Sequence, residues 1–271
     1  MTGPPDRFRQ FPAALARRAR LVRLGGEIPA LLAHPDWITP APVVIWLHGR
    51  TVSKELDPGR YLRWIRAGIA ACAIDLPGHG ERFDESLHRP GSAPALIERA
   101  LPEIDRVLAA LAEGSAALDL SRVAIGGMSA GGMIALRRLC DPHPFACAAV
   151  EAATGRLTRM YAARQSPTPP ETLARVDPSL HLDSWRPIPL LALHSEADRV
   201  VPVETMREFA GMLRERHAAL GADPAMVEMR TWPETGAPEE HAGFGRFSND
   251  AKNAQTEFLR RHLGPTPPDS L

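Results

Sequence analysis

The chain has 271 residues, enough for one large domain or two small ones with a sizeable buried core. Its composition is ordinary for a soluble enzyme, with 44% hydrophobic and 24% charged residues. The 32 basic and 32 acidic residues cancel, so the sequence lacks the positive charge expected of a protein that binds nucleic acids or acidic membranes.

The first third of the chain is predicted to form mostly strands. The expected strands are residues 19–24, 28–34, 43–47 and 69–74. Gly25-Gly26 predicts a tight turn between the first two. The third and fourth are uninterrupted apolar runs, which are typical of central parallel strands buried on both faces. Between them, Asp57 followed by proline predicts the N-cap of a helix that ends near residue 67.

Helices and strands alternate along the rest of the chain. The expected helices are 93–113, 131–139, 203–220 and 246–262, and the expected strands are 122–126, 145–150, 188–193 and 226–232. Pro102 is expected to kink or end the first of these helices. The alternation predicts a single α/β domain over residues 1–271, with a mostly parallel sheet covered on both faces. Residues 155–185, rich in proline and polar residues, are predicted to form a small insertion that caps the functional site.

The segment Gly127-Met128-Ser129-Ala130-Gly131 fits the G-x-S-x-G pattern of a nucleophile elbow. It follows the predicted strand 122–126 and opens the predicted helix 131–139, so Ser129 is expected on a sharp turn with its hydroxyl projecting from the sheet. The first turn of that helix offers free N–H groups and a dipole that favours developing negative charge. A chance glycine-serine turn is the alternative, but strand, turn and helix together favour a nucleophile.

A serine hydroxyl needs a base to take its proton and an acid to orient that base. In hydrolases with such an elbow, the acid and then the histidine follow the serine along the chain. Asp198, in a polar loop after the strand 188–193, is the first candidate for the acid. Glu151, at the end of the strand 145–150, is a rival, and Glu196 lies close enough to Asp198 to be confused with it. Asp198 could instead simply cap the next helix.

Ten histidines compete for the role of base. His241 is favoured because it lies in the loop between the last predicted strand, 226–232, and the closing helix. His217 falls inside a predicted helix and His262 lies near the end of the chain, so neither is placed to reach Ser129 from a loop.

His48-Gly49-Arg50 follows the apolar strand 43–47. Glycine permits a tight turn there, so the backbone N–H of Arg50 is predicted to point inward and to form an oxyanion hole with the N–H of Ala130. The Arg50 side chain either binds a substrate carboxylate or is simply solvated. His48 and His194, each at a strand end, are predicted to brace or pack rather than to act as bases.

No metal or cofactor is predicted. The histidines lack the spacing of a helical metal site, and the paired glycines fit neither a phosphate loop nor a dinucleotide fingerprint. Cys72, Cys140 and Cys147 have no metal-type spacing and are expected to be buried free thiols.

The sequence predicts no association with a membrane. Residues 1–20 contain arginines but no continuous apolar stretch, unlike a secretory signal. No segment approaches the ~20 apolar residues that span a bilayer. A reducing, cytoplasmic location is expected, and the pattern leaves open whether the protein is a monomer or a homodimer.

The motifs together resemble α/β hydrolases near dienelactone hydrolase and the prolyl oligopeptidase catalytic domain, and within these the small bacterial esterases. The matching segments, in the family's order, are 48–50 with 53–55, 75–82, 127–131, 189–202 and His241. The resemblance implies the α/β-hydrolase fold with an eight-stranded, mostly parallel sheet. It also implies a triad of Ser129, Asp198 and His241, no cofactor, and hydrolysis of a small-molecule carboxylic ester.

Three features depart from the pattern of the similar proteins. The H-G-x-x-D motif near the acid carries Ser195 in place of glycine. The loop before His241 is long and contains Glu234, Glu239 and Glu240. The nucleophile is serine, whereas dienelactone hydrolase proper uses cysteine, so that activity is disfavoured.

The insertion suggests where a substrate would bind. Met128 and four residues of the insertion are predicted to line an acyl pocket; the four are Leu157, Met160, Tyr161 and Trp185. Simple packing of these apolar side chains is the alternative. Because the insertion is small, short-chain acyl groups are expected. Two other functions remain open: a peptidase or amidase that uses the same triad, and a non-catalytic ligand-binding protein with the same fold.

Overall fold

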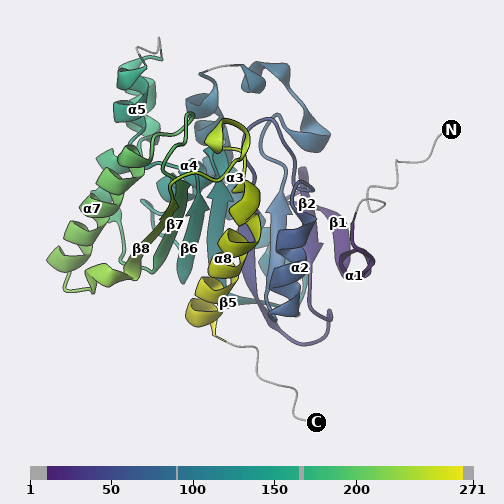
Figure 1. Ribbon diagram of the computed structural model, residues 1–271. Coiled ribbons are helices and arrows are strands. Elements are labelled where there is room, and N and C mark those ends of the chain that lie inside the picture. The colour runs from purple at the N-terminus through teal and green to yellow at the C-terminus, as the bar shows by residue number, and fades with distance from the viewer. Residues whose placement is uncertain (1–10, 90, 165–167, 265–271) are drawn as a thin grey trace.

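An eight-stranded sheet forms the middle layer of the molecule, in the order β1-β2-β4-β3-β5-β6-β7-β8 (Figure 1). The computed structural model describes residues 11–89, 91–164 and 168–264. The strands are β1 (Ala19–Leu24), β2 (Ile28–Ala33), β3 (Ala41–Leu47), β4 (Ala70–Ile74), β5 (Leu118–Met128), β6 (Cys147–Glu151), β7 (Leu190–Ser195) and β8 (Val227–Trp232). Strand β2 is antiparallel to both of its neighbours, and the strands from β4 to β8 are parallel to one another. The predicted mostly parallel, eight-stranded sheet is confirmed.

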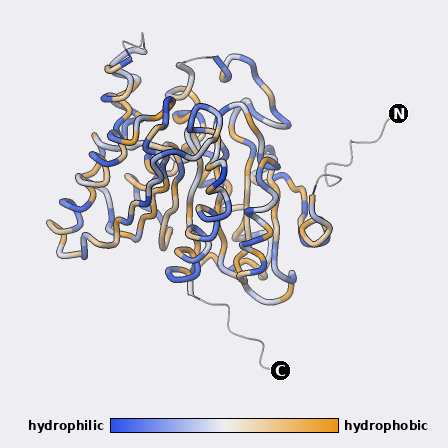
Figure 2. The backbone as a smooth tube through the Cα atoms, viewed as in Figure 1, coloured by the Kyte–Doolittle hydropathy of each residue, from blue (hydrophilic) through white to orange (hydrophobic). Residues whose placement is uncertain are grey.

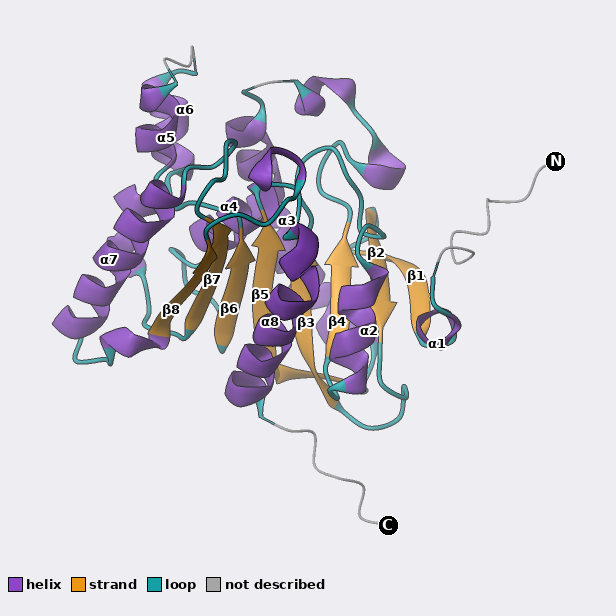
Figure 3. Cartoon of the chain, in the orientation of Figure 1, coloured by secondary structure: helices purple, strands orange, loops and turns teal. Residues whose placement is uncertain are grey.

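Helices cover both faces of this sheet (Figure 3). They are α1 (Ala13–Ala16), α2 (Pro58–Arg66), α3 (Ala93–Gly114), α4 (Ala130–Arg138), α5 (Leu157–Ala163), α6 (Pro170–Val176), α7 (Val203–Ala219) and α8 (Ser248–Leu263). Helix α2 begins as predicted, since the Asp57 side chain accepts a hydrogen bond from the N–H of Arg60 and proline follows at the first helical position. Within the described ranges, no helix combines the length and the apolar character needed to cross a bilayer.

The core consists of two apolar clusters, one on each face of the sheet. Trp46 and Phe258 belong to the cluster beneath α1, α2 and α8, whereas Ile45 and Phe209 belong to the cluster beneath α3, α4 and α7. Strands β3 and β4 contribute to both clusters because every one of their residues is buried. Helix α8 turns its apolar residues toward the sheet and leaves a mainly hydrophilic outer side (Figure 2).

Pro102 does not end a helix. Helix α3 runs continuously from Ala93 to Gly114 with Pro102 inside it. Proline removes the N–H that would bond the carbonyl of Glu98, but both residues are exposed, so water can satisfy that carbonyl. The prediction that a helix ends at Pro102 is therefore wrong, and the Glu98 carbonyl that lacks a helical hydrogen bond faces solvent.

The segment between β6 and β7 contains α5 and α6, which lie beyond the carboxyl ends of the strands beside α7 (Figure 3). In open α/β sheets, ligand-binding sites lie at the edge where the parallel strands have their carboxyl ends. The elbow, Asp198 and His241 all follow strands at this edge.

Candidate active site

Ser129 lies on a sharp turn between β5 and α4. Its φ of +51° falls in the left-handed region, which non-glycine residues rarely adopt and which stores backbone strain. The two glycines of the elbow are required by close approach: a Cβ on Gly127 would lie 2.6 Å from the carbonyl oxygen of Leu47, and one on Gly131 would lie 2.1 Å from the same atom. The turn can therefore pack against β3 only without side chains at these positions.

His241 bridges Ser129 and Asp198. Its Nε2 lies 2.8 Å from Ser129 Oγ, and its Nδ1 lies 2.8 Å from Asp198 Oδ2. The side chain of Asp198 is fully buried and that of His241 is 11% exposed. The structure thus brings three residues predicted from widely separated segments into one hydrogen-bonded chain. This chain can pass the hydroxyl proton of Ser129 to an oriented imidazole.

Asp198 is held as an anion by its surroundings. Burial alone would raise the pKa of Asp198, but hydrogen bonds from His194 and His241, with the N–H of Val201, lower it to about 2. The Oδ1 atom accepts from the N–H groups of Val200 and Val201 at 2.8 and 2.7 Å. Because Asp198 is ionised, Nδ1 of His241 carries the proton and donates it, which leaves the lone pair of Nε2 facing Ser129.

His194 also contacts the acid. Its Nε2 lies 2.8 Å from the carbonyl oxygen of Val201 and 3.3 Å from Asp198 Oδ2. It therefore braces the loop that presents Asp198, in addition to packing at the end of β7. This contact to the acid was not predicted from the sequence, where only its position at a strand end was evident.

Glu151, the rival acid, is engaged elsewhere. Its carboxylate accepts two hydrogen bonds from the guanidinium of Arg60, at 2.6 and 2.9 Å, and one from Gln255 Nε2 at 3.1 Å. Burial alone would lower the pKa of Arg60, but Glu151 and Asp57 outweigh it and raise that pKa. The carbonyl oxygen of Glu151 accepts from the N–H of Ser129 at 2.8 Å. Its side chain thus anchors α2 and α8 to β6, while its backbone supports the elbow.

The turn after β3 brings Arg50 to the edge of the site. Within the part of the chain that the structure describes, neither the backbone N–H of Arg50 nor that of Ala130 donates to a protein acceptor. The Arg50 side chain is fixed, because its Nη1 donates to the carbonyl oxygens of His88 and Arg89 at 2.9 and 2.6 Å.

His48 braces the same turn. Its Nε2 accepts from the N–H of Leu76 at 3.0 Å, so its Nδ1 carries the proton and donates to the carbonyl oxygen of Gly49 at 2.6 Å. Burial lowers the pKa of His48 to about 4, partly offset by that hydrogen bond, so the ring is neutral near pH 7.

Ser129 and His241 open onto a cavity of about 540 Å³. Its walls come from the turn after β3, from α2, and from the chain around the start of α8. Aromatic side chains and charged side chains both contribute; the former are Trp46, Tyr61 and Phe244, and the latter are Arg50, Asp57, Arg60, Glu151 and Lys252. The lining of the cavity therefore combines aromatic and charged side chains, of which Arg60 and Glu151 are buried.

The predicted pocket residues divide between this cavity and the core. Met128 lines the cavity, whereas the four predicted residues of the insertion do not; these are Leu157, Met160, Tyr161 and Trp185. All four are buried in the apolar cluster on the other face of the sheet, and Trp185 packs edge-on against Phe209 of α7. The apolar residues of the insertion therefore secure it to the core, and the cavity beside Ser129 lies on the α2 and α8 side.

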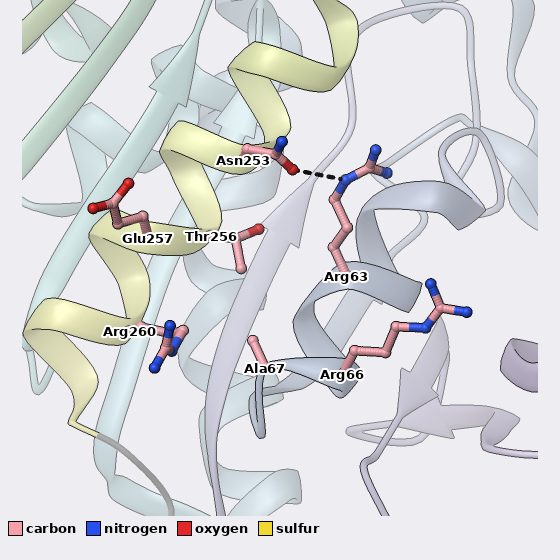
Figure 4. A pocket seen from close by; sticks show the side chains of 7 residues that line it. All are labelled: Arg63, Arg66, Ala67, Asn253, Thr256, Glu257 and Arg260. Carbon is pink, nitrogen blue, oxygen red and sulfur yellow. Dashed lines mark hydrogen bonds between the residues drawn. The ribbon is translucent and has the colours of Figure 1, made fainter.

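A second groove lies between α2 and α8, and Figure 4 shows Arg63 reaching toward Asn253 while Arg66 points away. This groove shares no lining residue with the cavity beside Ser129. It is open to solvent and its side chains include no nucleophile paired with a base, so it adds nothing to the chemistry of the elbow.

Cys72, Cys140 and Cys147 are buried free thiols, as predicted. Burial raises the pKa of each to about 12, which keeps them protonated and unreactive. Among the described residues, no group of three or more His, Cys, Asp or Glu side chains is arranged to hold a metal ion.

Comparison with known proteins shows to which family the chain belongs. Residues 61–266 match the prolyl oligopeptidase family. The chain belongs to this family. It is accordingly a serine hydrolase, and its sheet and helices have the arrangement of the α/β-hydrolase fold. The esterase YjfP of Escherichia coli (strain K12) is 29% identical over 254 residues, which are 88% of this chain and 96% of that protein.

Solved structures share the same fold. TT1662 from Thermus thermophilus is similar with a TM-score of 0.69 and 21% identity, over 91% of this chain and 98% of that one. The acylaminoacyl peptidase of Pyrococcus horikoshii gives a TM-score of 0.73 at 16% identity, over 93% of this chain but 43% of the peptidase. Thermogutta terrifontis esterase 2, in a form phosphoramylated by tabun, gives 0.63 at 17% identity, over 93% and 97% of the two chains.

Proposed function

We propose that this serine hydrolase is a carboxylesterase that cleaves small esters. Ser129 is the nucleophile, His241 the general base and then the general acid, and Asp198 the group that orients His241. The observation that carries the proposal is the continuous chain of two 2.8 Å hydrogen bonds from Asp198 through His241 to Ser129. The relationship to a protein named as an esterase over nearly its whole length supports an ester as the substrate.

The reaction proceeds in two halves. Ser129 Oγ attacks the ester carbonyl carbon while its proton passes to Nε2 of His241. The tetrahedral intermediate then collapses, the bond to the alcohol oxygen breaks, and His241 donates the proton to the departing alcohol. Water attacks the acyl-enzyme in the same way, and the carboxylic acid leaves as the proton returns to Ser129. Asp198 remains ionised and stabilises the imidazolium that forms in each half.

The oxyanion of each tetrahedral intermediate is held by the backbone N–H groups of Arg50 and Ala130. Arg50 lines the same cavity as Ser129, and Ala130 follows Ser129 and begins a helix whose dipole favours negative charge. Neither N–H donates to a protein acceptor among the described residues. Loss of one such donor typically costs ~3 kcal/mol of transition-state stabilisation. The tight packing of β3 against the elbow supports this assignment, because it brings the turn after β3 close to the start of α4.

The substrate occupies the cavity on the α2 and α8 side. Its volume of about 540 Å³ lies within the ordinary range for small-molecule sites and accommodates a short acyl chain with its alcohol. The chain acts as one domain, with residues 155–185 as an insertion beside the site. A series of p-nitrophenyl esters of increasing acyl length tests this: activity should peak at short chains, and a peak at long chains would contradict it.

The decisive experiment compares Ser129→Ala with a control serine on the same strand. Ser129→Ala should abolish hydrolysis of p-nitrophenyl acetate and labelling by a fluorophosphonate while the thermal melting curve stays as in the wild type. Ser121→Ala, at the exposed opposite end of β5, should keep both activities. Hydrolysis retained by folded Ser129→Ala would refute the proposal.

A peptidase or amidase is the second candidate. The family and the likeness of fold to an acylaminoacyl peptidase favour it. An amine leaves less readily than an alcohol, so the two functions separate on matched substrates. If the ester proposal is right, an alanine p-nitrophenyl ester will be cleaved far faster than the matching p-nitroanilide. A larger kcat/KM for the anilide would make the protein a peptidase, whereas absence of fluorophosphonate labelling would favour a ligand-binding role.

A further inference from the structure

The carboxylate of Glu240, the residue before His241, accepts four hydrogen bonds. Its Oε2 accepts from Ser195 Oγ at 2.7 Å, from the N–H of Thr235 at 2.6 Å and from Thr235 Oγ1 at 2.8 Å. Its Oε1 accepts from the N–H of Gly236 at 2.7 Å. A side chain that could have extended into solvent is therefore bound at both oxygens.

These bonds join two separate segments of the site. Ser195 is buried at the end of β7, and its carbonyl oxygen accepts from the N–H of Asp198 at 3.3 Å. Thr235 and Gly236 belong to the loop that runs from β8 to His241. A single carboxylate thus ties the strand end that presents the acid to the loop that presents the histidine. A second tie runs beside it, from the N–H of Arg199 to the carbonyl oxygen of Glu239 at 3.1 Å.

The backbone immediately before His241 is strained. Glu239 and Glu240 have φ angles of +53° and +54°, in the left-handed region that ordinary residues seldom occupy. Two such residues in succession persist only where surrounding contacts hold them. The hydrogen bonds of the Glu240 carboxylate hold this backbone together with the bond from the N–H of Arg199 to Glu239. Without the bonds of Glu240, we expect the loop to relax to a more favourable backbone and move His241.

The hydrogen bonds keep Glu240 charged. The N–H of Thr235 and the hydroxyl of Ser195 contribute most, and together with the other donors they lower the pKa of Glu240 to about 2. The side chain is therefore an acceptor at both oxygens at any pH near neutrality, which matches four donors facing it.

We propose that Glu240 is a positioning residue for His241, and that Ser195 is its partner on β7. This rests on the proposed function, because it assigns Glu240 the task of holding the imidazole between Asp198 and Ser129. The proposal gives one explanation for two features of the sequence, the serine at the end of β7 and the glutamates before His241. Neither Glu240 nor Ser195 touches the reacting atoms.

The test compares Glu240→Gln with its neighbour Glu239→Gln in the full-length enzyme. Glutamine has nearly the same size as glutamate, but it replaces one acceptor oxygen with an amide nitrogen that donates hydrogen bonds. That nitrogen would face N–H or O–H groups that also donate. Since small misplacements of catalytic groups cost ~10²-fold, kcat for p-nitrophenyl acetate should fall about 10- to 100-fold in Glu240→Gln, with KM within a factor of about two. The exposed side chain of Glu239 shares the strained backbone, so Glu239→Gln should leave kcat unchanged.

Two further readouts separate positioning from general destabilisation. The downfield proton NMR resonance of His241 Nδ1–H should be present in the wild type and in Glu239→Gln, and weakened or lost in Glu240→Gln. Ser195→Ala removes only one hydroxyl and should lower kcat less than Glu240→Gln does. The double variant should be no worse than Glu240→Gln alone, because the two side chains act through one hydrogen bond.

Wild-type kcat with an intact Nδ1–H resonance in Glu240→Gln would overturn the proposal. If Glu240→Gln fails to fold, Ser195→Ala decides: a reduced kcat with a native melting curve supports the positioning role, and a wild-type kcat overturns it. If Ser129→Ala retains hydrolysis, the proposed function itself fails, which this set of variants distinguishes from failure of the positioning role alone.

Discussion

Replacement of Glu151 by glutamine should weaken the fold far more than the chemistry. The Glu151 side chain is 2% exposed and pairs with an Arg60 side chain that is 6% exposed, so the variant leaves a buried guanidinium without its main counter-ion. Breaking such a pair costs roughly 3–5 kcal/mol. Asp57 Oδ2 remains 3.2 Å from Arg60, which places the expected loss near the lower limit, at about 3 kcal/mol.

Thermal unfolding and steady-state kinetics measure the two effects separately. A loss of about 3 kcal/mol corresponds to a fall in Tm of about 6 °C for a chain of this size. In the fraction that remains folded, kcat should change by less than about tenfold, since the Glu151 side chain does not contact His241. The double variant Glu151→Gln with Arg60→Met should recover part of the lost stability, because it removes the uncompensated charge as well.

Two results would contradict these expectations for Glu151. An unchanged Tm in Glu151→Gln would show that the pair with Arg60 does not stabilise the fold. A fall in kcat of several orders of magnitude, with Asp198→Asn still active, would make Glu151 the acid of the triad.

Three further predictions test the site and its surroundings. Asp198→Asn should lower kcat by ~10⁴-fold, because its amide cannot fix the tautomer of His241, while circular dichroism stays native; near-normal activity would exclude Asp198 as the acid. Gly131→Ala should fail to fold or lose fluorophosphonate labelling, since the new Cβ would meet the carbonyl oxygen of Leu47 at 2.1 Å; a stable, active variant would contradict the packing argument. Burial lowers the pKa of His48 from about 6.5 in the unfolded chain to about 4 in the folded protein. The stability that the neutral, buried imidazole contributes is therefore present above pH 6.5 and lost as the pH falls toward 4. The urea midpoint should therefore be lower at pH 4.5 than at pH 7, and an unchanged midpoint would count against this.

The central sheet was predictable because its strands carry a strong local signal. The runs 43–47 and 69–74 are apolar throughout, and β3 and β4 occupy almost the same residues. The position of Ser129 was predictable for a related reason, since a strand, two glycines and a helix surround it within a dozen residues. Local sequence patterns are enough to predict an element when the interactions that stabilise it come from nearby residues.

The choice between Asp198 and Glu151 was beyond such patterns. Glu151 ends β6 and Asp198 follows β7 at the same edge of the sheet, and both come after Ser129 in the chain. What separates them is Arg60, which lies 91 residues from Glu151 in sequence and engages its carboxylate. A partner that distant leaves no periodicity or motif near either acid.

The sequence could not show which apolar residues line the cavity beside Ser129, for a similar reason. An apolar side chain in an insertion can line a cavity or attach the insertion to the core, and the sequence is the same in both cases. Trp185 and Leu157 attach it, while the cavity is formed by the turn after β3 with α2 and α8. The contact between Ser195 and Glu240, 45 residues apart, was likewise invisible to a linear pattern.

Trapping the acyl-enzyme tests the role of Ser129 as the nucleophile directly. The protein is mixed with p-nitrophenyl acetate, quenched in acid during turnover, digested, and its peptides are mapped by mass spectrometry. We expect one acetyl group on Ser129 in the wild type and none in Ser129→Ala. Continued hydrolysis with no acetyl group on Ser129, or with the acetyl group on another residue, would contradict it.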